Sequence, residues 1–220
     1  MKKSIFTLGI IAVLFSINSC STKPKGDDAK VSEEQTVDST SGNELEINTE
    51  ISTIKFIGNG VGKNHPGEFK ITKGNLIVEN GEIKGGLFVI DVKSLSLMQK
   101  EEMFQTKLLP HILSPDFLDA EKYPSAQFEI TSVSPYTQGK DSSVTKGANY
   151  NISGNLTLKD ATKNISFPAK IEYSNGIFTT NASFNIDRTI WGITYGNDKS
   201  LKDKFISEVV NITLDIKSKL

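Results

Sequence analysis

Cysteine and histidine are almost absent from this sequence of 220 residues, which contains one cysteine, Cys20, and two histidines, His65 and His111. A single cysteine excludes an intrachain disulfide, and two histidines far apart in the chain argue against a zinc site. Catalytic signatures are missing as well, because the sequence has no Gly-x-Ser-x-Gly turn and no paired histidine and carboxylate motif. We therefore expect neither an enzyme nor a metal site.

An excess of charge of one sign is also missing. The 25 basic and 26 acidic residues give a net charge of −1, and this balance offers no electrostatic footprint for nucleic acid. The longest apolar run, residues 5–17, falls short of the roughly 20 residues that a membrane-spanning helix needs. Nucleic-acid binding and a spanning helix are both disfavoured.

The N-terminus has the organisation of a secretory signal peptide, in which two lysines precede the apolar run at residues 5–17. The sequence Ile17-Asn18-Ser19-Cys20 resembles the bacterial lipobox, although Asn18 departs from the small or apolar residue that is usual there. The resemblance implies a signal peptide at residues 1–19, more than one acyl chain on Cys20, and anchoring in the cell envelope, at the periplasmic face or the outer membrane. The alternative is an ordinary signal peptide with a chance cysteine.

Residues 20–43 are polar and contain only two large aliphatic residues after the lipid-attachment site, Val31 and Val37. Such a segment cannot bury enough apolar surface to offset the entropy of ordering, so we expect it to be disordered. As a flexible chain its ends would lie on the order of 25 Å apart. We interpret it as the lipidated N-terminus and a tether, and we place one folded domain at residues 44–220.

The folded part alternates apolar and polar residues with a period of two, which is typical of half-buried strands. Asn80-Gly81 and Asn175-Gly176 are hairpin-turn signals. Strands are expected near residues 51–57, 69–71, 76–78, 85–92, 127–131, 150–158, 165–173, 178–186 and 210–216. Lys73-Gly74 is expected to separate two of them.

From Met98 to Leu113 the apolar spacing fits a helix better, with Pro110 as a break. We interpret this section as an insertion packed across one end of the sheet. About eight antiparallel strands must pair two faces or close into a barrel, which removes exposed edges. An eight-stranded barrel holds either packed side chains or one slender ligand, and the sequence alone does not choose between them.

Five segments occur in order between Ile51 and Leu220. They are Ile51–Phe56, His65-Pro66-Gly67, Phe117–Phe128 with its Tyr-Pro, the Gly154–Lys163 hairpin, and Phe184–Ile193 with an Arg-x-x-aromatic-Gly pattern. Together they resemble the YceI-like family of bacterial exported proteins, except that Asp160-Ala161 stands where that family has glycine.

The resemblance implies an all-β fold, an extended lipocalin-like antiparallel β-barrel. It implies that the apolar interior holds a polyisoprenoid or similar long lipid non-covalently, with no enzymatic activity, no metal and no other cofactor. Members of the family often pair, so a homodimer is a further expectation. The competing hypothesis is a structural or interaction lipoprotein whose barrel is filled.

Two polar residues, Arg188 and His65, have two interpretations each. Arg188 either anchors a polar head group or fixes the Trp191-Gly192 corner by a salt bridge or a backbone hydrogen bond. His65 is either a polar contact or proton switch at the tunnel mouth or a turn histidine packed against its loop, and His111 is expected to pack or cap. Trp191 is a candidate for closing one end. The aromatic candidates for lining the tunnel are Phe56, Phe69, Phe88, Phe128, Phe167, Phe178 and Phe184.

Overall fold

The computed structural model describes residues 24–37, 41–137 and 142–219. The expected signal peptide and Cys20 lie outside the described residues. Within the described ranges, no helix is long and apolar enough to cross a lipid bilayer.

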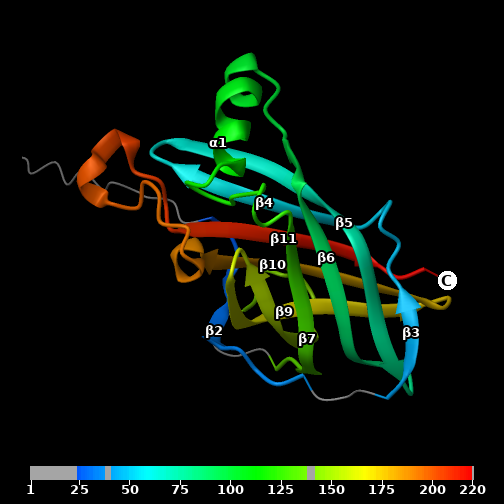
Figure 1. Ribbon diagram of the computed structural model, residues 1–220. Helices are drawn as coiled ribbons and strands as arrows, with labels where there is room; N and C mark the ends of the chain where they lie inside the picture. Colours follow the sequence, from blue (N-terminus) through cyan, green and yellow to red (C-terminus); the bar gives the residue numbers. More distant parts are fainter. Residues whose placement is uncertain (1–23, 38–40, 138–141, 220) are drawn as a thin grey trace, which may run out of the picture.

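Eight antiparallel strands form a closed barrel (Figure 1). Each strand pairs with the next along the chain, and the last strand pairs with the first. The predicted all-β barrel is therefore confirmed. Its strands are β4 (Thr53–Gly60), β5 (Lys63–Glu79), β6 (Glu82–Leu97), β7 (Ser125–Pro135), β8 (Tyr150–Leu158), β9 (Ala161–Ser174), β10 (Ile177–Asp187) and β11 (Val209–Lys217).

The tight turns between strands follow from residues that tolerate a left-handed backbone. Asn80 and Gly81 have φ values of 53° and 77° between β5 and β6, and Asn175 and Gly176 have 53° and 84° between β9 and β10. Positive φ at both central residues is the geometry of a type I′ hairpin turn, so both turn predictions are confirmed. Between β8 and β9 the left-handed position falls to Lys159, with φ of 56°.

The expected break at Lys73-Gly74 is wrong, because β5 continues through both residues. A Cβ atom on Gly74 would lie 3.0 Å from Cγ1 of Ile47 and 3.2 Å from Cδ1 of Phe88. Glycine inside a strand often marks such a close approach. Past this point β3 (Asn43–Glu46) pairs with β5 in place of β4.

Residues 24–35, which we call the N-terminal strap, are ordered, and the expectation of disorder is wrong for this part of the chain. β1 (Asp27–Asp28) pairs with β10, and β2 (Lys30–Glu33) pairs with β9. β9 and β10 pair directly only as far as Lys170 and Asn181. The strap therefore fills the gap where these two strands diverge.

Buried asparagine side chains hold the strap. Asn155 donates to the carbonyl oxygen of Gln35 at 2.7 Å and accepts from its N–H at 3.0 Å, and Asn185 donates to the carbonyl oxygen of Gly26 at 2.9 Å. The composition of the strap did not predict that it is ordered, because its partners are polar groups that lie 120 residues or more away in the sequence. The strap side chains that pack against the main core are Ala29 and Val31.

The helical insertion consists of a π-helical turn, η1 (Phe104–Leu108), that runs into α1 (Leu109–Leu113). The expected break at Pro110 is wrong, because the chain is helical on both sides of it, and the change from π-helical to α-helical geometry comes just before it. Leu108 and Ile112 pack with barrel residues Leu95 and Leu97. As expected, the insertion lies across one end of the barrel (Figure 1).

The structure predicts that adding a single methyl group at Gly154 in β8 lowers the stability of the fold strongly. A Cβ atom there would lie 2.4 Å from Cζ of Phe128 and 2.7 Å from the carbonyl oxygen of Glu129. We expect Gly154→Ala to lower the free energy of unfolding by about 2 kcal/mol, because the core has no room for the methyl group. Urea unfolding measures this. Gly58→Ala is the matched control, since nothing lies within 4 Å of a Cβ atom at Gly58, and equal losses in the two variants would contradict the prediction.

Candidate functional site

A cavity of about 340 Å³ lies inside the barrel. All eight barrel strands and the helical insertion contribute to its wall, because alternate residues of every strand face the barrel axis. The cavity reaches from Gly60 and His65 at one end to Ile83 and Ile216 at the other. The interior is therefore hollow, which does not fit the hypothesis of a filled barrel.

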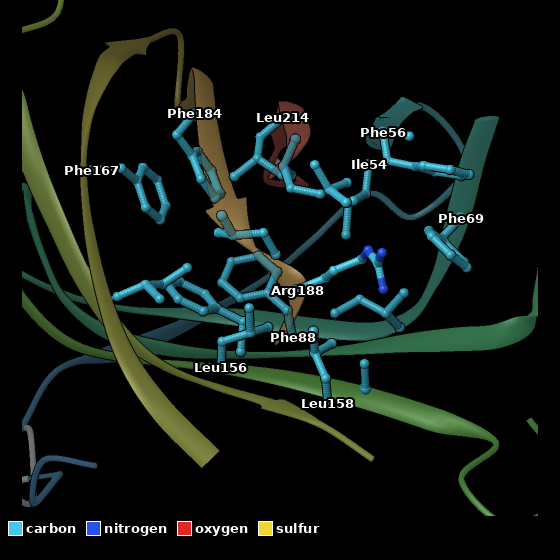
Figure 2. A pocket seen from close by; sticks show the side chains of 18 of the residues that line it. Ile54, Phe56, Phe69, Phe88, Leu156, Leu158, Phe167, Phe184, Arg188 and Leu214 are labelled. Atoms are coloured by element: carbon cyan, nitrogen blue, oxygen red, sulfur yellow. The ribbon is translucent and has the colours of Figure 1, made fainter. Parts of the chain in front are cut away.

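Strand β11 shows how the sequence builds this wall. Val210, Ile212, Leu214 and Ile216 face inward and line the cavity. Ile212 and Leu214 are only half-buried although they face the axis, because empty space replaces the side chains that would otherwise cover them. Figure 2 shows Leu214 and its neighbour Ile54 pointing toward the same space.

Aromatic rings line much of the cavity (Figure 2). Phe167 and Phe184 are stacked, with ring centroids 3.9 Å apart and planes 12° apart. They come from β9 and β10 at the level where the strap separates these strands. Six of the seven expected phenylalanines line the cavity: Phe56, Phe69, Phe88, Phe128, Phe167 and Phe184.

Phe178 and Trp191 are not part of the cavity wall. Phe178 packs against Tyr173, with ring centroids 4.5 Å apart, next to the hairpin between β9 and β10. Trp191 is 1% exposed, and its indole N–H donates to the carbonyl oxygen of Leu156 at 2.9 Å. Both residues belong to the main hydrophobic core.

Arg188 begins the short helical turn η2 (Arg188–Trp191) after β10 and lines the cavity (Figure 2). Its guanidinium donates to four backbone carbonyl oxygens, those of Ile193, Tyr195, Ile206 and Ser207. These bonds fasten the connection between β10 and β11 at this end of the barrel. The structure thus contains the corner-fixing contacts expected for Arg188, and it also places the residue where a ligand would lie.

Burial lowers the pKa of Arg188, and the nearby carboxylates of Asp187 and Glu208 partly oppose this effect. Because the ordinary pKa of arginine is so high, the side chain stays charged at neutral pH. Its guanidinium carbon lies 5.7 Å from the ring centre of Phe117. The cavity therefore contains a positive charge in a largely apolar wall.

A YceI-like domain model matches residues 45–218. The chain belongs to the YceI-like family. The resemblance of its motifs to that family is thereby confirmed.

Solved structures similar to this YceI-like chain share its fold. BcnA of Burkholderia cenocepacia superimposes with a TM-score of 0.62 at 18% identity, covering 79% of this chain and 99% of BcnA. A polyisoprenoid binding domain from Saccharophagus degradans, described as implicated in plant cell wall breakdown, gives a TM-score of 0.57 at 11% identity, covering 80% and 97%. At these identities the similarity establishes the fold alone.

Curated relatives are closer in sequence but match a shorter stretch. The UPF0312 protein of Pseudomonas putida strain KT2440 is 34% identical over 103 residues, which is 47% of this chain and 47% of the relative. The match therefore spans about half the length of the curated relatives.

The two histidines of the YceI-like chain have different surroundings. His65 lies near the start of β5 and not in a loop, and it lines the cavity with its Nδ1 atom 2.9 Å from Oε1 of Gln99. His111 lies in α1 and pairs with Asp116 at 3.0 Å. Its ring is edge-on to two aromatic rings of the same cluster, Phe117 and Tyr195.

The cavity wall contains few ionisable side chains. Of the described residues that line it, only His65 and Arg188 are ionisable. In the part of the chain that the structure covers, no group of three or more His, Cys, Asp or Glu residues could hold a metal ion. Such a wall suits an apolar molecule that leaves water.

The sequence interpretation named no individual aliphatic residue of the YceI-like cavity wall. The cavity wall includes the aliphatic residues Ile54, Leu156, Leu158, Ile212 and Leu214. Their signal was present, because they occupy the same faces of the period-two pattern. The insertion residues in the wall gave no such signal, since only tertiary packing brings them over the barrel end: Leu108, Ile112, Phe117 and Leu118.

Proposed function

We propose that this YceI-like protein binds a long apolar lipid of the polyisoprenoid type inside its barrel, and carries or sequesters it in the cell envelope. The continuous apolar cavity is the observation that supports this. Burial of each methylene in such a cavity contributes roughly 0.8 kcal/mol, and ordering and association costs offset much of the sum. The binding activity named for the Saccharophagus degradans domain supports the same ligand class.

The proposal includes attachment to a membrane through acyl chains on Cys20 after removal of residues 1–19. Two acyl chains are enough for stable anchoring, whereas one gives only marginal binding. The cell-envelope location is proposed from the N-terminal sequence, and a homodimer is proposed only from the resemblance to the family.

The experiment is mass spectrometry of protein purified from its native host. We expect organic extraction to release one long-chain lipid per protein, and the N-terminal peptide to begin at a lipid-modified Cys20. Absence of stoichiometric lipid would contradict the binding proposal, whereas an unmodified Cys20 would remove only the anchor.

A matched pair of variants links the lipid to the cavity. Ile54 faces the cavity from β4, and its neighbour Lys55 is exposed on the outer face of the same strand. Ile54→Trp places a larger side chain in the empty space, so we expect at least a fivefold loss of co-purified lipid. Lys55→Trp should retain the lipid. Equal lipid content in both variants would show that the lipid binds elsewhere.

A further inference from the structure

The charge inside the cavity is unusual for this chain. Arg188 is the one arginine in the sequence, where all other basic residues except the two histidines are lysines. It is 5% exposed, and the described cavity wall contains no Asp, Glu or Lys. Arginine keeps its charge on burial, unlike lysine. The protein therefore has a permanently positive side chain in the wall of a largely apolar cavity.

The guanidinium of Arg188 is surrounded by backbone carbonyl dipoles, and no carboxylate of the described residues forms an ion pair with it. Its Nε atom donates to the carbonyl oxygen of Ser207 at 2.9 Å, and its Nη2 atom donates to those of Tyr195 and Ile206 at 2.9 and 3.0 Å. Its Nη1 atom donates to the carbonyl oxygen of Ile193. Four of the five N–H groups are thus engaged, and one on Nη1 has no acceptor among the residues that the structure describes.

The nearby carboxylates do not neutralise the guanidinium. Asp187 accepts hydrogen bonds from the N–H and the hydroxyl of Thr189, at 2.9 and 2.6 Å. Among the described residues, the carboxylates of Asp187 and Glu208 form no ion pair with the guanidinium, and its hydrogen-bond acceptors are all backbone carbonyl oxygens. A buried charge without an ion-pair partner lowers the stability of the fold. A ligand that carries a negative charge can provide that partner.

The cavity is also polar at one end and apolar at the other. Arg188 bonds to the backbone of Ser207, whose own N–H donates to the carbonyl oxygen of Asn59 at 2.8 Å, and Gly58 pairs with His65. These neighbouring residues all line the same end of the cavity, while Ile83 lies at the far end among apolar residues. An amphipathic ligand therefore has one favourable orientation, with its head at Arg188.

We propose that the lipid bound by this protein carries an anionic head group, a phosphate or a carboxylate, that lies against Arg188. The inference rests on the proposed function and narrows its ligand class. An anionic oxygen supplies both the missing acceptor for Nη1 and the missing charge, and such charge-assisted bonds are stronger than neutral ones. A neutral alcohol or quinone supplies the acceptor alone.

The test compares ligands that share one chain and differ in the head group. Purified full-length protein, freed of co-purified lipid, is loaded with the neutral fluorophore N-phenyl-1-naphthylamine. Geranylgeranyl phosphate, geranylgeranic acid and geranylgeraniol are then used to displace it. We expect at least one of the anions to bind tenfold or more tightly than the alcohol, and the stronger of the two identifies phosphate or carboxylate. The preference should persist in 0.5 M salt, because salt screens buried charges weakly.

Substitutions distinguish the effect of Arg188 on the head-group preference from the effect of positive charge on the outer surface. Arg188→Gln should bring the three affinities within about twofold of one another, and Arg188→Lys should keep part of the preference. Lys55→Gln removes a positive charge from the outer face and should leave the preference intact. The comparison on the unmodified protein decides the question even if Arg188→Gln does not fold.

The outcomes separate the two proposals. Equal affinities, or tighter binding of the alcohol, would overturn the anionic head group and leave the lipid-binding function standing. Failure of all three ligands to displace the fluorophore would overturn both.

Discussion

Replacement of Arg188 by methionine is expected to lower the free energy of unfolding by roughly 3–4 kcal/mol. Methionine fills a similar volume but has no N–H group, so it leaves four backbone carbonyl oxygens without their donor. An unsatisfied buried acceptor costs about 1–3 kcal/mol, and some of the four will regain water as the connection between β10 and β11 loosens. The loss should therefore be large but smaller than the sum of four such costs.

Urea unfolding followed by tryptophan fluorescence measures the effect, because Trp191 is the single tryptophan and lies in the same helical turn as Arg188. Lys170→Met is the control. It also removes a positive charge, but one in a partly exposed ion pair with Glu172, and such pairs contribute about 0–1 kcal/mol. If Arg188→Met loses no more stability than Lys170→Met, the four carbonyl bonds do not support the fold.

Removal of residues 1–35 is expected to destabilise the barrel by roughly 3–5 kcal/mol and to loosen the wall between β9 and β10. The deletion takes away the strap that pairs with both strands. It also leaves the buried amides of Asn155, Asn185 and Asn211 without their strap partners, and unsatisfied buried polar groups are costly. The exposed strand edges should favour self-association as well.

Hydrogen exchange measures the local part of this effect. We expect fast amide exchange at residues 163–166 and 184–185, where the strap pairs with the barrel, and unchanged exchange in β5 and β6. Removal of residues 1–23 is the control, because it keeps the whole strap. Unaltered protection of β9 and β10 in the longer deletion would mean that the strap is not part of the wall.

A milder variant tests the same contact without a deletion. A Cβ atom on Gly26 would lie 2.4 Å from Nδ2 of Asn211 and 2.6 Å from Oδ1 of Asn185. Gly26→Val should therefore displace the strap at this point and increase exchange at residues 184–185. This variant keeps the length of the chain, so it distinguishes loss of the contact from loss of the segment.

The local features of this protein were readable from its sequence. The period-two alternation predicted the strands, and the Asn-Gly pairs predicted two hairpin turns, because both depend on neighbouring residues only. The order of the motifs indicated the YceI-like family, and six of seven chosen phenylalanines line the cavity. These features can be predicted without knowing which side chains face one another across the barrel.

The hollow interior, the ordered strap and the isolated charge of Arg188 were decided by tertiary structure. Alternation shows which side chains face inward, but whether opposite walls touch depends on the barrel radius, which long-range strand pairing sets. The strap is ordered by asparagines that lie 120 residues or more along the chain, and no local composition reports them. The lack of a counter-charge at Arg188 likewise becomes visible only when the eight strands have closed around it, because a charge is isolated by its neighbours in space and not in sequence.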